Sequence, residues 1–430
     1  MGLVSNIIFG VLLAVGIGFF VKNINKLIRN IKLGKAVDIS GSTSERWKNM
    51  AMIALGQSKM VTRPIAGILH VIVYIGFVVI NIEVLEIVID GLFGTHRIFS
   101  SIGPVYGILI GTFEIFALLV FVAVVVFWLR RNVIRLKRFM SSEMKGWPKQ
   151  DGNLILYFEI VLMALFIIMN ATDVQFQNMN SGNVISQFVA PWFEGLPLHA
   201  IERTAWWMHI IGILIFLNYL YYSKHLHIIL AFPNTYYGRL TPNGQLDNLE
   251  SVTNEVKLMM DPDADPYAVS DDADAEPEKF GASDVFDLNR IQLLNAYTCT
   301  ECGRCTSECP ANQTGKKLSP RKIMMDTRDR LHEVGKNIDA NKGVFTPDGK
   351  QLLGDYITNE ELWACTSCNA CVEACPISIN PLSIILDMRR YLVMEQSAAP
   401  TELNTMMTNI ENNGAPWPYN QMDRLNWNKE

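Results

Sequence analysis

Five long apolar stretches limit what this chain of 430 residues can fold into. They cover residues 3–21, 64–89, 102–129, 154–171 and 204–222. Each is close to the ~20 helical residues that cross a bilayer. Half of all residues are apolar, yet 18% are charged. This mixture predicts a membrane part joined to a soluble part, in a chain long enough for two or three domains.

The charges of the connecting loops predict how these helices are oriented. Residues 22–63 hold nine Lys or Arg and residues 130–152 hold seven, whereas residues 90–101 and 172–203 hold one each. Loops rich in Lys and Arg stay on the cytoplasmic side. We therefore expect the N-terminus outside and everything after the fifth helix in the cytoplasm. The predicted localisation is multi-pass, in the cytoplasmic membrane of a bacterium or archaeon.

All eight cysteines lie in two copies of the pattern C-x-x-C-x-x-C-x-x-x-C-P. A thiolate at every third residue wraps three corners of an iron–sulfur cube, and the fourth cysteine usually binds the other cluster. We therefore expect two [4Fe–4S] clusters. The first would be held by Cys299, Cys302, Cys305 and Cys375, and the second by Cys365, Cys368, Cys371 and Cys309.

Two zinc sites or four disulfides are the alternatives for these cysteines. Structural zinc sites usually pair two C-x₂₋₄-C units, and this chain has runs of four cysteines with a proline behind each. Disulfides need an oxidising compartment, whereas the expected topology places the cysteines in the cytoplasm. The spacing therefore favours clusters.

Histidines within the apolar stretches are candidate haem ligands, because a buried imidazole needs a partner. We expect His70 and His227 to hold a haem b on the cytoplasmic side, with His225 as the rival to His227. If the fifth helix continues to Pro233, His209 lies five turns and about 27 Å before His227 on the same face. For His209, a second haem and a hydrogen-bonded packing role both stay open.

Three acidic residues fall in the outer half of the predicted spans: Glu83, Glu86 and Glu114. Quinone chemistry moves protons together with electrons, so a buried carboxylate beside a quinone would be useful. A packing acid bonded to a neighbouring helix is the equal alternative.

We predict an all-α membrane bundle of five transmembrane helices, followed by a mainly α-helical, ferredoxin-like dicluster domain. The domains would be the membrane bundle at 1–235, an acidic linker at 236–288, the cluster domain at 289–395 and a C-terminal docking tail at 396–430. Residues 261–278 carry eight acids and no base, which is typical of a solvated linker. The sequence has no basic patch with interleaved aromatics, so we do not expect it to bind nucleic acid. The sequence also has no Walker loop and no dinucleotide fingerprint, so we expect no organic-substrate site in this chain.

The segment TGKKLSPR at 314–321 resembles the cluster domain of heterodisulfide reductase and is similar to the iron–sulfur subunits of anaerobic glycerol-3-phosphate dehydrogenase. The tail N-G-A-P-W…D-R-L-N-W is similar to a stretch common downstream in that family. The five-span part resembles the gamma (cytochrome b) subunit of respiratory nitrate reductase and the membrane subunit of heterodisulfide reductase. The segment YSKHLH at 222–227 carries that likeness best. In the nitrate reductase pattern the second helix has two haem histidines, whereas here it has only His70.

These resemblances imply a membrane-bound electron-transfer subunit of a quinone-linked oxidoreductase. It would carry electrons between a cytoplasmic redox partner and the quinone pool through the two clusters and haem b, in a direction that the sequence leaves open. The chain has no CCG motif, which implies a separate partner subunit of that type. The alternative is a haem-free membrane anchor and assembly platform for a cytoplasmic iron–sulfur oxidoreductase.

Overall fold

The computed structural model describes residues 2–37, 39, 41–263 and 279–429. Those residues form helices, turns and loops, and they contain no strand beyond two isolated bridges. Five helices are long and apolar enough to cross a membrane, as the sequence predicts. They are α1 (Leu3–Ile31), α3 (Pro64–Phe93), α4 (Pro104–Asn132), α5 (Trp147–Thr172) and α8 (Leu198–Tyr219).

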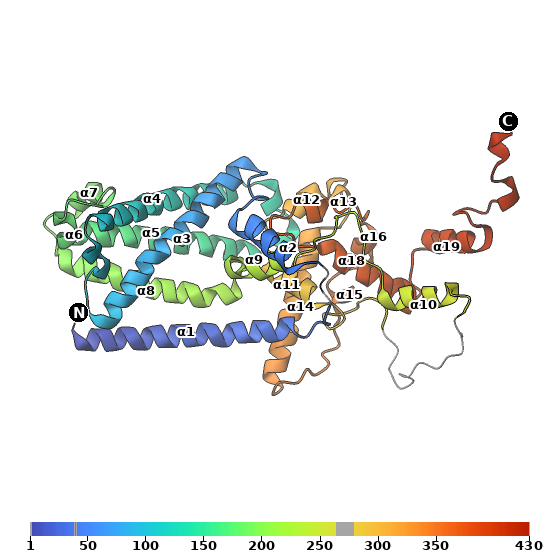
Figure 1. Cartoon of the computed structure of the whole chain (residues 1–430), viewed down its shortest axis with the longest axis horizontal. Helices are drawn as coiled ribbons and strands as arrows, with labels where there is room; N and C mark the ends of the chain where they lie inside the picture. The colour runs from blue at the N-terminus through green and yellow to red at the C-terminus, as the bar shows by residue number, and fades with distance from the viewer. Residues whose placement is uncertain (1, 38, 40, 264–278, 430) are drawn as a thin grey trace.

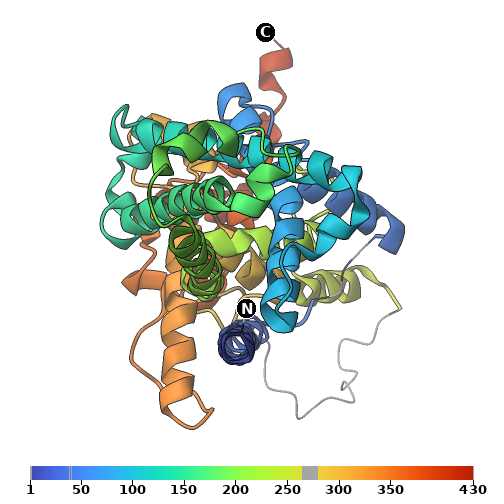
Figure 2. The same cartoon turned by 90° about the vertical axis from the view of Figure 1, so that its left-hand side faces the viewer.

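The five helices pack in a ring in which each contacts two neighbours. α3 packs on α4, α4 on α5 and α5 on α8, and α1 closes the ring against α3 and α8. Fully buried aromatic side chains, among them Tyr106, Phe113 and Phe166, fill the centre. Viewed along the bundle, α1 is seen end-on at the margin (Figure 2). Large apolar side chains cover the outside of the helices, as expected of a surface that faces lipid.

The soluble part adjoins one end of the bundle, and the N-terminus lies at the other end (Figure 1). Short helices complete the connections of the membrane part: α2 (Thr43–Met50), α6 (Val174–Asn178) and α7 (Ser186–Val189). The soluble part is built from α11 (Arg290–Thr298), α12 (Arg304–Glu308), α13 (Pro310–Gln313), α14 (Pro320–Ala340), α15 (Leu352–Asp355), α16 (Asn359–Trp363), α17 (Ala370–Glu373) and α18 (Pro381–Arg390). The all-α fold class is confirmed.

The fifth span ends at Tyr222, as the sequence predicts, but the helix does not continue to Pro233. α8 stops at Tyr219, a 3-10 turn continues to Tyr222, and Ser223 has an extended backbone. A second turn then leads into α9 (His227–Tyr236). Asp151 of α5 holds this break, because its carboxylate accepts hydrogen bonds from the Ser223 hydroxyl (2.6 Å) and the Lys224 amide (3.1 Å). The expectation of one continuous helix from His209 to His227 is therefore wrong.

The segment predicted as an acidic linker contains α10 (Glu250–Met260), which buries no side chain. Most of its acidic run, residues 264–278, lies outside the described residues. Ala282, Val285 and Leu288 are fully buried against the cluster domain. In the predicted tail, α19 (Thr401–Asn413) is followed by two exposed tryptophans, Trp417 and Trp427. The division into domains and the docking role of the tail stay predictions.

α1 continues past the membrane bundle and contacts the cluster domain. Lys26 and Arg29 pair with Asp339 of α14 at 2.6 and 2.5 Å. Asn30 donates a hydrogen bond to the Tyr297 hydroxyl at 2.9 Å. Gly335 of α14 allows this close approach, because a Cβ atom there would lie 2.3 Å from the Asn30 amide nitrogen.

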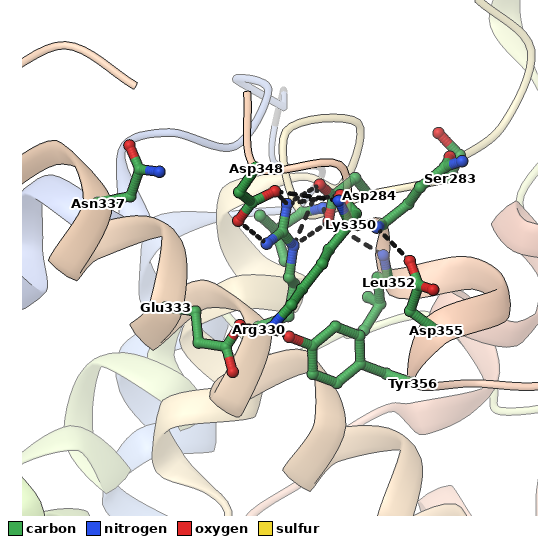
Figure 3. A network of polar contacts seen from close by, with 12 residues as sticks. Ser283, Asp284, Arg330, Glu333, Asn337, Asp348, Lys350, Leu352, Asp355 and Tyr356 are labelled. Atoms are coloured by element: carbon green, nitrogen blue, oxygen red, sulfur yellow. Dashed lines mark hydrogen bonds and ion pairs between the residues drawn. The ribbon is translucent and has the colours of Figure 1, made fainter. Parts of the chain in front are cut away.

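A fully buried arginine holds three segments of the cluster domain together (Figure 3). Arg330 of α14 pairs with Asp284 at 2.8 Å and with Asp348 at 2.6 Å, and it also donates to the Lys350 carbonyl at 2.8 Å. These ion pairs hold the pKa of Asp348 below its usual range. The planar guanidinium suits this task, since it presents five donors in one rigid fork.

Replacing Arg330 with Met should destabilise the cluster domain by about 2–3 kcal/mol. Removing one partner of a buried ion pair leaves a charge uncompensated, and here both carboxylates keep some contact with water, which reduces the effect. Thermal unfolding would measure the loss, and hydrogen exchange of residues 348–352 should speed up. Lys336→Met, at an exposed position on the same helix, is the control. An equal loss of thermal stability in both variants would contradict the stabilising role of the Arg330 ion pairs.

Candidate metal centres

The two cysteine runs adopt the same backbone conformation. Each begins C-T-x-C-x-x-C, and the third and fifth residues of each run are left-handed. These are Glu301 (φ 55°) and Gly303 (72°) in the first run, and Ser367 (55°) and Asn369 (59°) in the second. Glycine and asparagine enter this region most easily, so Gly303 and Asn369 are the sequence signal of the turn. The repeat therefore places its cysteines in equivalent turns.

The fourth cysteine of the second run lies beside the first three cysteines of the first run. A cavity of about 380 Å³ is lined by five cysteines: Cys299, Cys302, Cys305, Cys371 and Cys375. The Cys375 sulfur also accepts a hydrogen bond from the Ile379 amide at 3.3 Å. The structure thus brings together the four residues predicted for the first cluster.

The other predicted set is also gathered. Burial, together with the neighbouring Cys365, Cys309 and Cys368, raises the pKa of the Cys371 thiol to about 12. Burial, together with the nearby Cys302 and Cys375, likewise raises the pKa of Cys299 to about 12. All eight cysteines are free thiols. Buried thiols that oppose one another's ionisation are suited to a cationic metal centre, which binds them as thiolates.

The spacing of these thiols separates a cluster from a zinc ion. Four thiolates on one zinc ion lie within about 4 Å of one another, because each Zn–S bond is about 2.3 Å. In the described parts of the chain, no three His, Cys, Asp or Glu side chains are close enough to hold a single metal ion. The spacing of the two cysteine runs is therefore the reason to expect iron–sulfur clusters rather than zinc.

Three histidines meet at the end of the bundle beside the cluster domain. The His70 ring of α3 lies 6.3 Å from the His227 ring of α9, measured between ring centres, and His225 lies 5.4 Å from His227. The His227 Nδ1 atom contacts the Lys224 carbonyl at 3.2 Å. His70 buries its Nδ1 atom without a partner among the described residues. His225 has a polar neighbour, because its Nε2 atom lies 4.0 Å from the Glu159 carboxylate.

His70 and His227 are placed so that they could hold one iron between them. Two imidazoles that each bind a metal at about 2 Å from opposite sides have ring centres about 6 Å apart. A ligating histidine usually donates its other ring N–H to a carbonyl or carboxylate, as His227 can to Lys224. At His70 the buried Nδ1 atom has no partner among the described residues and could itself bind the iron. The residues present therefore fit a haem.

The remaining histidines are separate from this group. His209 contacts the Leu162 carbonyl through Nδ1 at 3.1 Å, and its buried Nε2 has no partner among the described residues. His96 pairs with Asp173 at 3.2 Å, and His199 is exposed. The structure shows no second histidine near His209 among the described residues, so a second haem stays a prediction.

The three candidate carboxylates have different surroundings. Glu114 accepts hydrogen bonds from the Ile185 and Ser186 amides at 2.7 and 3.0 Å, and Glu86 accepts from the Phe99 amide at 2.8 Å. Glu83 instead buries one oxygen without a partner among the described residues. It also lines a cavity of about 350 Å³ at the end of the bundle away from the clusters. Of the three, Glu83 alone buries a carboxylate oxygen without a partner among the described residues, and Glu86 lines the same cavity.

Sequence reasoning missed the ion network that joins the histidines to the first cysteine run. Lys224, beside His225, forms ion pairs with Glu301 and with Asp151, which is 3.7 Å away. Glu301 lies between Cys299 and Cys302 and also pairs with Arg328 of α14 at 2.8 Å. Burial raises the pKa of Glu301, but both cations lower it, and the pKa ends below its usual value. A lysine next to the histidines and an acid inside a cysteine loop were the only signals.

A second hydrogen-bond chain joins α9 to the second cysteine run. Asn234 of α9 donates to the Ile377 carbonyl at 2.7 Å and accepts from Asn295 at 3.1 Å. Asn295 in turn accepts from the Asn380 amide at 2.7 Å. The helix that starts at His227 is therefore fixed directly to the turn after Cys375.

Replacing Lys224 with Met should destabilise the protein by about 3–5 kcal/mol, because two buried carboxylates lose the cation that they share. The Glu301–Lys224 pair stabilises the native state above the unfolded pKa of Glu301 and is lost as pH falls through its lowered native pKa. The difference between variant and parent should therefore shrink on acidification. Denaturant unfolding at several pH values measures it, with Lys317→Met at an exposed pair as the control. A pH-independent difference would contradict this account.

Comparison with known proteins agrees with the cysteine geometry. Residues 298–379 match the family model of the 4Fe–4S dicluster domain. The chain carries a 4Fe–4S dicluster domain. This domain contains all eight cysteines, so the iron–sulfur assignment no longer depends on spacing alone.

Three relatives extend the likeness. A probable iron–sulfur-binding oxidoreductase of Bacillus subtilis is 29% identical over 100% of the chain and 61% of its own length. An EtfAB:quinone oxidoreductase of Syntrophomonas wolfei is 25% identical over 87% of the chain and 53% of its own length. A CoB–CoM heterodisulfide reductase subunit of Methanosarcina acetivorans is 32% identical over 28% of the chain and 60% of its own length. No solved structure matches the chain.

The homologues are thus iron–sulfur oxidoreductases and heterodisulfide reductase subunits, as the resemblance implied. They support an electron-transfer role, and the five apolar helices indicate a membrane protein. The chain spans 61% and 53% of the lengths of the first two relatives, so their full activities do not transfer to it directly.

Proposed function

We propose that this dicluster protein carries electrons between a soluble redox partner and the quinone pool, through two [4Fe–4S] clusters and a haem b. The observation that carries the proposal is the 6.3 Å separation of the His70 and His227 rings beside the cluster domain. Cys299, Cys302, Cys305 and Cys375 would hold one cluster, and Cys365, Cys368, Cys371 and Cys309 the other. Such groups, when bound, exchange single electrons at potentials tuned by their ligands and hydrogen bonds.

Contacts between the first cysteine run and α3 support a short path between the centres. Arg304 donates to the carbonyls of Lys59 and Met60 at 3.1 Å, just before α3 begins. Arg63 donates to the Ser307 hydroxyl at 2.7 Å. These bonds fix the start of the helix that bears His70 against the cysteine loop.

The quinone would exchange its protons at the opposite end of the bundle. Glu83, with its unpartnered oxygen in the far cavity, is the residue that we propose for this exchange. One relative is a quinone oxidoreductase, which supports quinone as the exchangeable substrate. Glu86 and Glu114, whose oxygens bind backbone amides, would instead hold the loops at that end.

The clusters would face the cytoplasm of a bacterium or archaeon. Both basic loops, residues 22–63 and 130–152, lie at the cluster end of the bundle, and Lys and Arg mark cytoplasmic loops. A separate redox subunit, of the CCG type found with heterodisulfide reductase, would dock there and exchange electrons with the clusters. The relatedness to a heterodisulfide reductase subunit supports such a partner.

A reduced-minus-oxidised visible spectrum of the purified protein tests this function. We expect a b-type α-band with about one or two haems per eight cluster irons. A quinol analogue should reduce that haem, and dithionite should reduce it together with the clusters. If only the broad bleaching of iron–sulfur clusters appears, the protein is a haem-free anchor and assembly platform, and the proposal fails.

A further inference from the structure

An open pocket of about 860 Å³ lies where α3 begins and α4 ends, beside the first cysteine run. On one side its lining comes from residues 62–66, which include the first turn of α3. On the other side it comes from Arg130 near the end of α4 and from residues 136–138 in the loop to α5. Of these side chains, the proposed electron path involves only Arg63, through its contact with Ser307.

The lining is strongly basic and contains no acid. Four cationic side chains contribute to it: Arg63, Arg130, Lys137 and Arg138. Arg63 pairs with Glu308 at 2.7 Å, whereas no carboxylate in the described residues pairs with the other three. Arg138 also buries its Nε atom without a hydrogen-bond partner among those residues. An anion would satisfy both the charge and the unused donors.

The first turn of α3 adds backbone donors. The amides of Ile65 and Ala66 precede the first intrahelical hydrogen bonds and are therefore free to bind a ligand. Such amides and the positive end of a 30-residue helix favour phosphate groups. Backbone and side chains thus point to the same ligand chemistry.

Exposed apolar side chains surround the basic pocket. Ile65 is 63% exposed, and Val133 and Ile134 are each 62% exposed. Ile68 and Leu129 continue the apolar surface along α3 and α4 toward the middle of the bundle. A charged pocket at a helix end with bare apolar helix below it matches a phospholipid, whose headgroup is anionic and whose tails are apolar.

We propose that this pocket binds the phosphate headgroup of an anionic phospholipid from the leaflet next to the cluster domain. Its acyl chains lie along the exposed surfaces of α3 and α4. The bound lipid also joins the two parts of the chain, because Arg63 contacts Ser307 and the Arg138 carbonyl accepts from Arg321 at 2.6 Å. A free phosphate compound shares the headgroup chemistry but not the need for the apolar surface.

Native mass spectrometry of the delipidated full chain, titrated with phosphatidylglycerol or phosphatidylcholine, tests this site. The test variant is Arg130→Gln/Lys137→Gln/Arg138→Gln. The matched control is Arg135→Gln/Lys145→Gln/Lys149→Gln, three exposed cations of the same loop region. Iron content checks that both variants are folded. Since each cation near the surface contributes roughly fivefold, the test variant should bind phosphatidylglycerol about a hundredfold more weakly than the parent.

The parent should prefer phosphatidylglycerol over phosphatidylcholine, the control variant should keep that preference, and millimolar inorganic phosphate should not displace the lipid. Equal weakening in the test and control variants would show that only general surface charge attracts lipid, and would overturn the proposal. Displacement by inorganic phosphate would also overturn it, because the ligand would then be a free anion.

Discussion

Replacing Cys309 with serine should remove the cluster of the second cysteine run, although Cys309 belongs to the first run. Iron and acid-labile sulfide should fall from about eight to about four per chain, because the fourth cysteine of such a run ligates the other cluster. The reduced protein should keep one electron paramagnetic resonance signal of the two. Cys375→Ser should also leave about four irons per chain, but it should remove the electron paramagnetic resonance signal that Cys309→Ser keeps.

Comparing Cys309→Ser with Cys375→Ser shows whether each fourth cysteine binds the cluster of the other run. Cys375 lines one cavity with Cys299, Cys302 and Cys305, whereas Cys309 is a neighbour of Cys371. If each run held its own cluster, Cys309→Ser would instead abolish the signal that Cys299→Ser abolishes. A matching loss in Cys309→Ser and Cys365→Ser is the expected outcome. Ser307→Ala, beside Cys309 but without a sulfur, serves as the control for local disturbance.

Replacing either His70 or His227 with alanine should abolish the haem spectrum and leave the iron–sulfur content intact. If the two rings, whose centres lie 6.3 Å apart, hold one iron between them, losing either ring removes a ligand. Pyridine haemochrome and iron analyses on the same preparation measure both. The unchanged cluster iron shows that the variant is folded.

His225→Ala provides the matched comparison, because His225 lies beside His227 but already has Glu159 as a polar neighbour. It should keep the haem. Loss of haem in His225→Ala with retention in His227→Ala would exchange their roles. Retention of the haem in all three variants would show that other residues hold it and would return these histidines to packing roles.

The sequence predicts the parts of this protein whose signals are local. A run of about 20 apolar residues can only be a spanning helix in lipid, so the five helices follow from hydropathy. The cysteine spacing fixes a turn with few solutions, and Pro320 after Ser319 marks the start of α14, where the Ser319 hydroxyl caps the helix.

The sequence could not predict features that depend on distant partners. The apolar span ends at Tyr222 and apolar residues resume at 228–232, so the sequence is compatible with one helix to Pro233. In the fold, Asp151 holds a break at Ser223 from 72 residues away. The same break turns Lys224 toward Glu301 and brings His227 to His70. Likewise, Glu83 and Glu114 look alike in the sequence. Only the fold shows that Glu114 binds two backbone amides of the loop at 185–186.

The contact between α1 and α14 sets an order for the assembly of this chain. Arg29 is made early, but its partner Asp339 follows 310 residues later. At a synthesis rate of about 5–20 residues per second, the end of α1 waits roughly 15–60 s for that partner. During this interval the ring of membrane helices can close while the end of α1 beyond it stays unbound. The last step of biogenesis would then be the docking of a folded, cluster-loaded domain onto a helix that was inserted first.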